Sequence, residues 1–307
     1  MNLKIQGKTF FSLTGVGKLP AIPVQRVRAG SLLARREVSG HNDKRSIPMS
    51  EVDGVDKLAG ATNGDGCSYG GEYLKWKAWA EESFGTLMKK DSSHFSAEIG
   101  KTGTVFALGS KVLEIGYGNG SFLAFAKERR WEVVGTEVST DLVEIARRKG
   151  FNVHHTDNLR SFPDDSFDLI VAFDVLEHIP EENLPEFLHQ IVRTLKNNGC
   201  FVARFPNGDS PFGLPAQNGD ITHTTAIGSG KVRYFAGSLS VELLYVGAES
   251  QPLLGVGLAR FIHRLVALPV KKIINTFVNM LFFRSRDIAF CSPNLILIYR
   301  SRKSIPQ

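Results

Sequence analysis

Short apolar runs alternate with amphipathic segments from residue 111 to residue 206. The apolar runs are typical of buried strands, whereas the segments between them repeat apolar residues at helical spacing. Strands are expected at 111–116, 131–139, 151–157, within 167–179 and at 200–206, and helices at 121–130, 140–150 and 181–199. Such alternation predicts a parallel sheet with helices on both faces, which is an α/β, doubly wound, Rossmann-like fold.

The rhythm changes after residue 206. Residues 206–235 are rich in Gly, Pro, Asn and Asp and predict a long polar loop, the candidate substrate loop. Residues 239–250 and 293–300 predict two further strands, the last of them antiparallel. The apolar segment 253–286 lies between these two strands and predicts helices. The complete sheet is therefore expected to be mostly parallel and seven-stranded, with a C-terminal helical insertion before the last strand.

Residues 1–68 differ from the rest of the chain, because they lack helix or strand periodicity and are rich in Gly, Ser, Arg and Lys. We expect a flexible leader there and one domain over 69–300. The segment 72–85 predicts a helix with aromatic residues, among them Trp79, on one face. That helix either packs on the domain or covers its ligand pocket.

Composition narrows the class of protein only slightly. The chain has 307 residues and a formal net charge of +6, which is compatible with anionic substrates, nucleic acid or anionic lipid. Its three cysteines form no CxxC pair, which argues against a disulfide framework or a zinc site and fits a reducing compartment. The N-terminus lacks the continuous apolar core of a signal peptide, so we expect a cytoplasmic protein.

The first predicted strand ends in a glycine-rich turn. Gly116, Gly118 and Gly120 follow Glu114 in the pattern ExGxGxG, which lets the backbone approach a bulky ligand closely. Dehydrogenases use GxGxxG at this place, so the spacing argues against a hydride-transfer enzyme. Glu137 closes the second strand, where a carboxylate can accept both hydroxyls of a ribose.

Polar residues also end the third and fourth strands. Asp157 and Asn158 follow the third strand, where a side chain can reach an adenine amino group, and Asp174 follows the fourth. In order, VLEIGYGNGSFL, GTEVS, TDN, FDLIVAFDVLEHIP and LKNNGCFVARFPN resemble the motifs of the class I S-adenosylmethionine-dependent methyltransferases.

This resemblance implies S-adenosyl-L-methionine as cofactor, held by a core at 105–206. In that family the three glycines surround the methionine part, Glu137 holds the ribose and Asp157 the adenine. The implied cofactor residues are Glu114, Gly116, Gly118, Gly120, Glu137, Asp157, Asn158 and Asp174. Nucleic acid is not expected as the substrate, because FDVLEH stands where nucleic-acid methyltransferases carry an N/D-PPY tetrad.

Two histidines are candidates for the base that removes a proton from the methyl acceptor. His178 follows the fourth strand and His223 lies in the polar loop; we prefer His223 by a small margin. Asp174, Glu177 and His178 form a D-x-x-E-H cluster similar to the E-x-x-E-H of metal-using quinone-pathway O-methyltransferases. The same acidic residues are equally typical of a helix N-terminus, so we assign no metal.

The polar loop suggests the acceptor. RFPNGDSPFG and QNGDITH resemble the post-strand region of methyltransferases from bacterial polysaccharide and lipopolysaccharide gene clusters, which implies O-methylation of a sugar or glycan precursor. The implied substrate residues are Arg204, Asn207, Asp209 and Asp220. The alternatives are O- or N-methylation of another small metabolite such as a quinone-like phenol, a protein of this fold that binds without catalysis, and a loop that needs its Asn and Asp residues for turns.

The C-terminal segment carries a basic face. Arg260, Arg264, Lys271 and Asn275 fall within about 60° on a helix, as expected for a helix lying on an anionic membrane. We prefer the other interpretation, in which helices pack over the sheet or at a dimer interface and break at Pro269. The charge-free apolar stretches of 253–283 are shorter than the roughly 18–20 residues that a membrane span requires.

Overall fold

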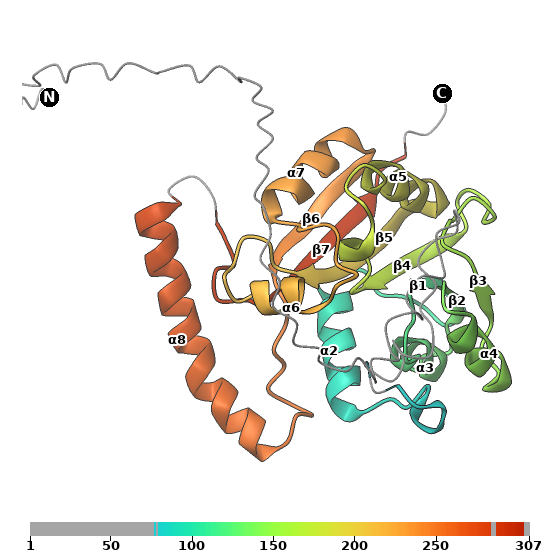
Figure 1. Cartoon of the computed structure of the whole chain (residues 1–307), viewed down its shortest axis with the longest axis horizontal. Helices are drawn as coiled ribbons and strands as arrows, with labels where there is room; N and C mark the ends of the chain where they lie inside the picture. The colour runs from blue at the N-terminus through green and yellow to red at the C-terminus, as the bar shows by residue number, and fades with distance from the viewer. Residues whose placement is uncertain (1–76, 78, 284–286, 304–307) are drawn as a thin grey trace, which may run out of the picture. The chain divides into compact units, whose positions relative to one another are not determined.

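A seven-stranded sheet forms the centre of the domain in a computed structural model, which describes residues 77, 79–283 and 287–303 (Figure 1). The strands lie in the order β3-β2-β1-β4-β5-β7-β6. Their bounds are β1 (Lys111–Ile115), β2 (Glu132–Glu137), β3 (Val153–His155), β4 (Phe167–Phe173), β5 (Leu195–Pro206), β6 (Val241–Ala248) and β7 (Asn294–Ser301). The first five are parallel, and β7 runs antiparallel to β5 and β6. The predicted mostly parallel α/β sheet is confirmed.

Helices cover both faces of this sheet, as predicted. They are η1 (Glu81–Ser83), α2 (Lys89–Gly100), α3 (Ser121–Glu128), α4 (Thr140–Arg148), η2 (Leu176–His178), α5 (Leu184–Thr194), α6 (Leu214–Gly219), α7 (Ser229–Ser238) and α8 (Leu258–Phe282). Successive residues of β1 point to opposite faces: Leu113 joins the core cluster that includes α5 and α7, and Val112 the cluster that includes α2 and α3. Both residues are fully buried, so the strand is apolar on both sides.

The strand order places the site. Because β1 lies between β2 and β4, the connections that follow β1 and β4 leave the sheet toward different faces, and a crevice opens at their carboxyl ends. The last paired residues of the two strands are Ile115 and Ala172. The glycine turn follows one directly, and the segment from Asp174 to His178 follows the other.

Two predicted boundaries are wrong. The helix expected at 181–199 ends at Thr194, because β5 begins at Leu195, which pairs with Phe167. Gly199 therefore lies in the strand, where a Cβ would come within 2.9 Å of the Phe167 carbonyl oxygen. The polar loop expected at 206–235 is not continuous either, since α6 and most of α7 lie within it.

The N-terminal predictions are tested only in part. The leader at 1–68 lies outside the described residues, as do residues 72–76 and 78 of the predicted aromatic helix. In the part of that segment that is described, the short helix η1 forms, and Trp79 precedes it without being helical.

The expected break at Pro269 is wrong, because α8 continues through that residue as one helix of 25 residues. Pro269 is exposed, so the carbonyl that loses its partner one turn earlier lies on the side away from the protein. All 25 residues are described and none is buried, so α8 does not pack over the sheet, whereas packing at a dimer interface stays a prediction.

Candidate active site

The glycine turn after β1 has a backbone that suits glycine alone. Gly116, Gly118 and Gly120 have φ angles of 64°, 50° and 72°, in the left-handed region where other residues are strained. A Cβ on Gly118 would come within 2.9 Å of the Trp79 indole, and one on Gly120 within 2.7 Å of the Phe84 ring. Trp79 therefore packs against the turn, and the covering of a ligand pocket by its segment stays a prediction.

Glu137 fixes this turn from the neighbouring strand. Its Oε2 accepts a hydrogen bond from the Gly118 amide at 3.2 Å, and its Oε1 accepts from the amides of Val138 (2.8 Å) and Ser139 (3.2 Å). Burial raises the pKa of the Glu137 carboxyl, and these three amides counteract the rise. The carboxylate is thus placed beside the turn by strand β2 and oriented by backbone groups.

Glu114 lies buried at the end of β1. Burial, and then the charge of Glu137, raise the pKa of its carboxyl well above the usual value. Its Oε2 has no hydrogen-bond partner among the described residues. A buried polar atom without a partner at the edge of a glycine turn fits a site that a polar ligand completes.

Asp157 and Asn158 lie exposed just beyond β3, at the same edge of the sheet. The Asn158 side-chain amide donates to Oδ1 of Asp157 at 3.3 Å, and its oxygen accepts from the Arg160 amide at 3.2 Å. The Asp157 carboxylate is thus held in place at the surface, where a ligand can reach it.

Asp174 and Arg204, expected to contact cofactor and substrate respectively, contact each other. The Arg204 guanidinium donates two hydrogen bonds to Asp174, from Nε to Oδ1 at 2.9 Å and from its second nitrogen to Oδ2. Burial lowers the pKa of Arg204, but Asp174 more than offsets this and raises it above the usual value. The guanidinium also lies 5.7 Å from the centre of the Phe173 ring. Asp174 and Arg204 thus form a charged pair at the carboxyl ends of β4 and β5.

The two candidate histidines meet although they are far apart in sequence. Their rings lie 4.6 Å apart at 76°. Nε2 of His223 is 3.7 Å from Oδ2 of Asp220 and 3.9 Å from Oε1 of Glu177. Nδ1 of His178 is 3.0 Å from the hydroxyl of Thr222 and 3.3 Å from its carbonyl oxygen. The structure thus joins both predicted base residues with one predicted substrate residue, Asp220.

Backbone contacts hold this cluster together. The amides of Thr224 and Thr225 donate to the carbonyl oxygen of Glu177 at 2.9 and 3.0 Å, and the Thr225 hydroxyl donates to that of Ile179. These bonds fasten the loop after β5 to helix η2 after β4. His223, in the loop after β5, consequently faces His178 in helix η2.

The pKa values of the two carboxyl groups in this cluster shift in opposite directions. Burial, and then the charge of Asp174, raise the pKa of Glu177 well above the usual value, so its carboxyl favours the neutral form. Burial also raises the pKa of Asp220, but hydrogen bonds from Thr222 and Lys77 outweigh it and lower the value to about 2. Burial and then His223 lower the pKa of His178, which favours its neutral, proton-accepting form.

Three of these side chains could hold a metal ion. One ligand atom each from Glu177, His178 and His223 lies within 4.8 Å of the others. Neither carboxylate oxygen of Glu177, nor Nδ1 of His223, has a hydrogen-bond partner among the described residues. Asp174 of the D-x-x-E-H cluster is paired with Arg204 and is not one of these three side chains. The candidate ligand set therefore contains His223 in place of Asp174.

Two predicted substrate residues have structural roles instead. Asn207 is buried; its amide donates to the carbonyl oxygens of Ala289 and Ser292 at 2.9 Å each, and its oxygen accepts from the Asp209 amide at 3.0 Å. The Asp209 carboxylate accepts from the Ser229 amide at 2.6 Å, which satisfies the N-terminus of α7. Their side-chain polar groups are engaged within the chain.

Sequence reasoning missed two members of the cluster. Nζ of Lys77 forms an ion pair with Asp220 at 3.0 Å, across 143 positions of sequence, so no local pattern points to it. Thr222 follows Asp220 by two residues, and its amide donates to Oδ1 of Asp220 at 3.0 Å. This aspartate-based turn is the signal that could have identified Thr222.

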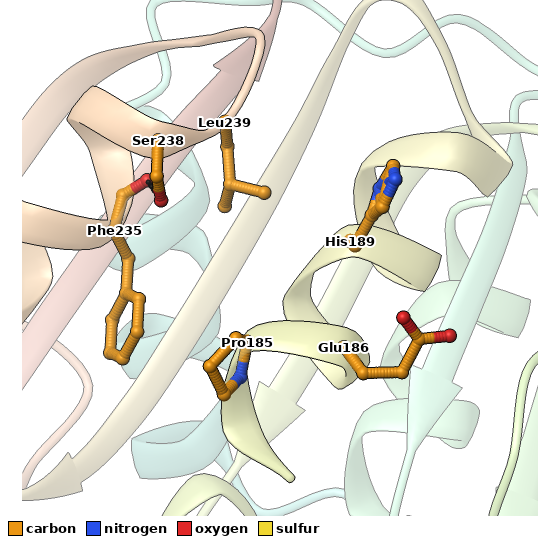
Figure 2. A pocket seen from close by; sticks show the side chains of 6 residues that line it. All are labelled: Pro185, Glu186, His189, Phe235, Ser238 and Leu239. Atoms are coloured by element: carbon orange, nitrogen blue, oxygen red, sulfur yellow. Dashed lines mark hydrogen bonds between the residues drawn. The ribbon is translucent and has the colours of Figure 1, made fainter. Parts of the chain in front are cut away.

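A surface pocket of about 280 Å³ lies elsewhere, between α5 and the end of α7. Figure 2 shows Pro185, Glu186 and His189 on one side and Phe235, Ser238 and Leu239 on the other. None of these six residues belongs to the predicted site.

Comparison with known proteins now supplies the family context. Residues 87–238 match the family model of a methyltransferase domain. No curated protein matches the sequence. A SAM-dependent methyltransferase from Archaeoglobus fulgidus has a similar structure at 21% identity, covering 76% of this chain and 100% of its own, with a TM-score of 0.53. An S-adenosylmethionine-dependent methyltransferase from Mesorhizobium loti is similar at 15% identity, covering 68% and 97%, with a TM-score of 0.46. At 21% identity the Archaeoglobus fulgidus structure shows the shared fold.

The residues at the sheet edge fit S-adenosylmethionine. A backbone without side chains at Gly116–Gly120, a carboxylate beside it at Glu137 and an exposed carboxylate at Asp157 lie at the carboxyl ends of three neighbouring strands. The methyltransferase domain model covers all of them. Residues 87–238 thus form a methyltransferase domain of the class I fold, an enzyme domain with S-adenosyl-L-methionine as its cofactor.

Proposed function

We propose that this enzyme methylates a hydroxyl oxygen and that His178 accepts the hydroxyl proton. The observation that carries the proposal is the chain Asp220–Thr222–His178. The Thr222 hydroxyl donates to Oδ1 of Asp220 at 2.5 Å, so its oxygen accepts from Nδ1–H of His178 at 3.0 Å. This assigns the proton to Nδ1 and the lone pair to Nε2. A base oriented by a second and a third group is the usual arrangement of a catalytic histidine.

This assignment changes the preference that the sequence gave. His223 has its Nδ1 buried without a partner among the described residues, and its Nε2 faces two carboxyl groups. We therefore give His223 the supporting role. It packs edge-on against His178.

Methyl transfer then needs positioning and one proton movement. Bound S-adenosylmethionine supplies a methyl group on a sulfonium, an electrophile that needs no further activation. Transfer of that methyl group would break its bond to sulfur and form a bond to the acceptor oxygen, and Nε2 of His178 would take the hydroxyl proton. Asp220, with its pKa lowered to about 2, stays ionised and stabilises the imidazolium through Thr222.

We propose a sugar or glycan precursor as the acceptor. Lys77, Asp220, Thr222 and His178 form one hydrogen-bonding cluster beside the base, and a polyhydroxylated ligand offers both donors and acceptors to such a cluster. The resemblance of the loop after β5 to polysaccharide-cluster methyltransferases supports the same class. We place the enzyme in the cytoplasm, with a small-molecule or glycan substrate and no nucleic acid.

A second candidate is O-methylation of a phenolic acceptor with the help of a divalent cation. The spacing of Glu177, His178 and His223 favours it, because these three side chains could bind the cation and the cation could hold a phenolate. In that case His178 would be a ligand and not a base. The two candidates therefore make opposite demands on the same imidazole.

Methyl-labelled S-adenosylmethionine separates these candidates. The full chain is incubated with nucleotide-activated sugars, lipid-linked saccharides and catechols, with and without a chelator. We expect label in a saccharide, stable to mild base as an ether is, and no effect of the chelator. Label in catechols alone, lost with the chelator, would establish the second candidate. Label in neither class would overturn the sugar proposal.

A further inference from the structure

Helix α8 is oriented differently from most helices on the surface of a soluble domain. In a helix on the surface of a soluble domain, the apolar face packs on the core and the polar face meets water. Here polar and apolar side chains share the half-buried positions, and the polar ones recur at helical spacing. The half-buried residues are Phe261, Arg264, Ala267, Leu268, Lys271, Asn275, Val278 and Asn279. The polar face of α8 thus lies toward the protein.

Specific hydrogen bonds fix that orientation. Arg264 donates to the carbonyl oxygen of Pro252 in the segment that leads into the helix. Oδ1 of Asn275 accepts from the Cys291 amide at 2.8 Å. Asn279 is bonded to Ile288 twice, accepting from its amide and donating to its carbonyl oxygen, at 2.9 Å each. The polar side chains are therefore engaged by the segments on either side of α8.

The apolar face is left uncovered by the described residues. Six large apolar side chains along it are between 49% and 69% exposed: Ile262, Leu265, Val266, Val270, Ile273 and Phe277. Figure 1 shows α8 as a long orange helix. At about 1.5 Å per residue its 25 residues extend over roughly 37 Å. A contiguous exposed apolar face is typical of an interaction surface or a membrane-binding surface.

The charges of α8 have one sign. The helix contains Arg260, Arg264, Lys271 and Lys272 and no Asp or Glu. Of these, Arg260 and Lys272 are exposed, and they lie at the margins of the apolar face. An apolar face flanked by cations is complementary to a bilayer with anionic headgroups.

The topology argues against a helix that crosses the bilayer. By length and composition α8 could span a membrane, with a mean hydropathy of 1.4 in its most apolar window. However, it connects β6 with β7, and these strands pair so that Ala248 lies opposite Leu295. A single span would require the chain between α8 and β7 to cross back. Its described residues, 283 and 287–293, form no helix or strand, so their backbone polar groups would lack partners in hydrocarbon.

We propose that α8 is an in-plane membrane anchor, with its apolar face in the acyl region of an anionic bilayer and its basic residues at the headgroups. The anchor is tied to the enzyme, because residues 288–292 also contact the loop after β5. Asn207 donates to Ala289 and Ser292, and Ser210 donates to the Phe290 carbonyl oxygen at 2.5 Å. Use of this anchor to reach a lipid-linked acceptor rests on the proposed function; membrane binding itself does not.

Flotation of the full chain with vesicles tests the proposal. We expect binding to vesicles of phosphatidylcholine and phosphatidylglycerol in equal parts, much weaker binding to phosphatidylcholine alone, and loss of binding in high salt. The double variant Ile273→Ser/Phe277→Ser should lower the partition coefficient about tenfold or more. The control Val105→Ser/Leu108→Ser removes two apolar side chains that are 94% and 72% exposed outside α8, and it should bind normally.

Other outcomes overturn the proposal. Equal binding by the α8 variant and the control, or no binding by the native chain, would exclude the membrane anchor. A dimer in solution that Ile273→Ser/Phe277→Ser dissociates, without vesicle binding, would show that a second copy covers the face. Phe277→Trp fluorescence should be quenched by lipids brominated near the headgroup; quenching only by lipids brominated at the bilayer centre would indicate a span. Vesicle binding needs no cofactor or acceptor, so its failure leaves the proposed function untouched.

Discussion

Nε2 of His223 lies 3.9 Å from Oε1 of Glu177, and both side chains are buried. The carboxyl group comes from the segment after β4 and the imidazole from the loop after β5. Burial and the charge of Asp174 raise the pKa of Glu177, so its carboxyl group favours the neutral form. A buried neutral carboxyl group without a hydrogen-bond partner among the described residues is costly, which points to a role in the chemistry or in its geometry.

His178→Ala should lower turnover by about 100-fold or more, because it removes the proposed base, and should leave the Kd of S-adenosylmethionine unchanged. Calorimetry and a methyl-transfer assay measure the two quantities. Thr222→Val tests positioning: it removes the hydroxyl between Asp220 and His178, so kcat should fall while cofactor affinity persists.

The dependence of turnover on pH also tests the assignment of His178 as the base. The pKa of His178 is lowered, so the base is already neutral below its ordinary titration range, and activity should persist to lower pH than a typical histidine allows. In Thr222→Val this acidic limb should move. The proposed assignment is rejected if His223→Ala abolishes turnover while His178→Ala retains it.

Glu177→Gln should change how stability depends on pH. The pKa of the Glu177 carboxyl is higher in the folded state than in the unfolded state, so the folded chain binds more protons between the two values. Stability therefore falls as pH rises through that window, by about 1.4 kcal/mol for each unit by which the pKa is raised. The amide does not titrate, so the variant should lose part of this slope.

Thermal unfolding between about pH 5 and about pH 8 measures the effect. Glu114→Gln provides a comparison, because burial also raises the pKa of Glu114, and it should flatten the profile in the same direction. Parallel stability profiles for the native chain and Glu177→Gln would show that Glu177 is ionised in the folded state.

The cofactor half of the site could be predicted from the sequence, because its groups lie within one turn of a strand end. Gly116–Gly120 and Glu137 carry local patterns of spacing, and the alternation of apolar runs predicts the mostly parallel sheet. The structure adds that Glu137 holds the turn itself, through the Gly118 amide. Such a contact joins neighbouring strands and has no signature in either one.

The acceptor half could be predicted only in its residue types. The sequence pattern of the Asn and Asp residues in the loop after β5 is equally typical of turns and of ligand binding. In the structure their contacts differ. Asn207 and Asp209 form hydrogen bonds within the fold, whereas Asp220 lies beside His223. Lys77 could not be assigned, because its partner lies 143 positions away. The pairing of Arg204 with Asp174 was hidden for the same reason, since it joins two strand ends.

Gly118→Ala should weaken cofactor binding. A Cβ at φ 50° is strained by about 1–2 kcal/mol and would meet the Trp79 indole at 2.9 Å, so the turn or the aromatic cover must shift. We expect the Kd of S-adenosylmethionine to rise roughly tenfold or more. Gly103→Ala is the matched control, because Gly103 has φ 65° with no heavy atom within 4 Å of a Cβ. Equal cofactor affinities in the two variants would show that the contact of the added Cβ with Trp79 does not affect cofactor binding.

Asn207→Ala should destabilise the protein without affecting substrate affinity. The change removes two donors and one acceptor from a buried site, leaving the carbonyl oxygens of Ala289 and Ser292 without their bonds. Unsatisfied buried groups cost about 1–3 kcal/mol each, so we expect a loss of roughly 2–4 kcal/mol in the free energy of unfolding. Asn218→Ala removes an exposed amide of the same loop and should be neutral. Denaturant unfolding compares the two variants, and the acceptor KM decides the role of Asn207. If Asn207→Ala raises KM at unchanged stability, its amide binds the acceptor, as the sequence suggested, and the contacts to residues 289 and 292 are secondary.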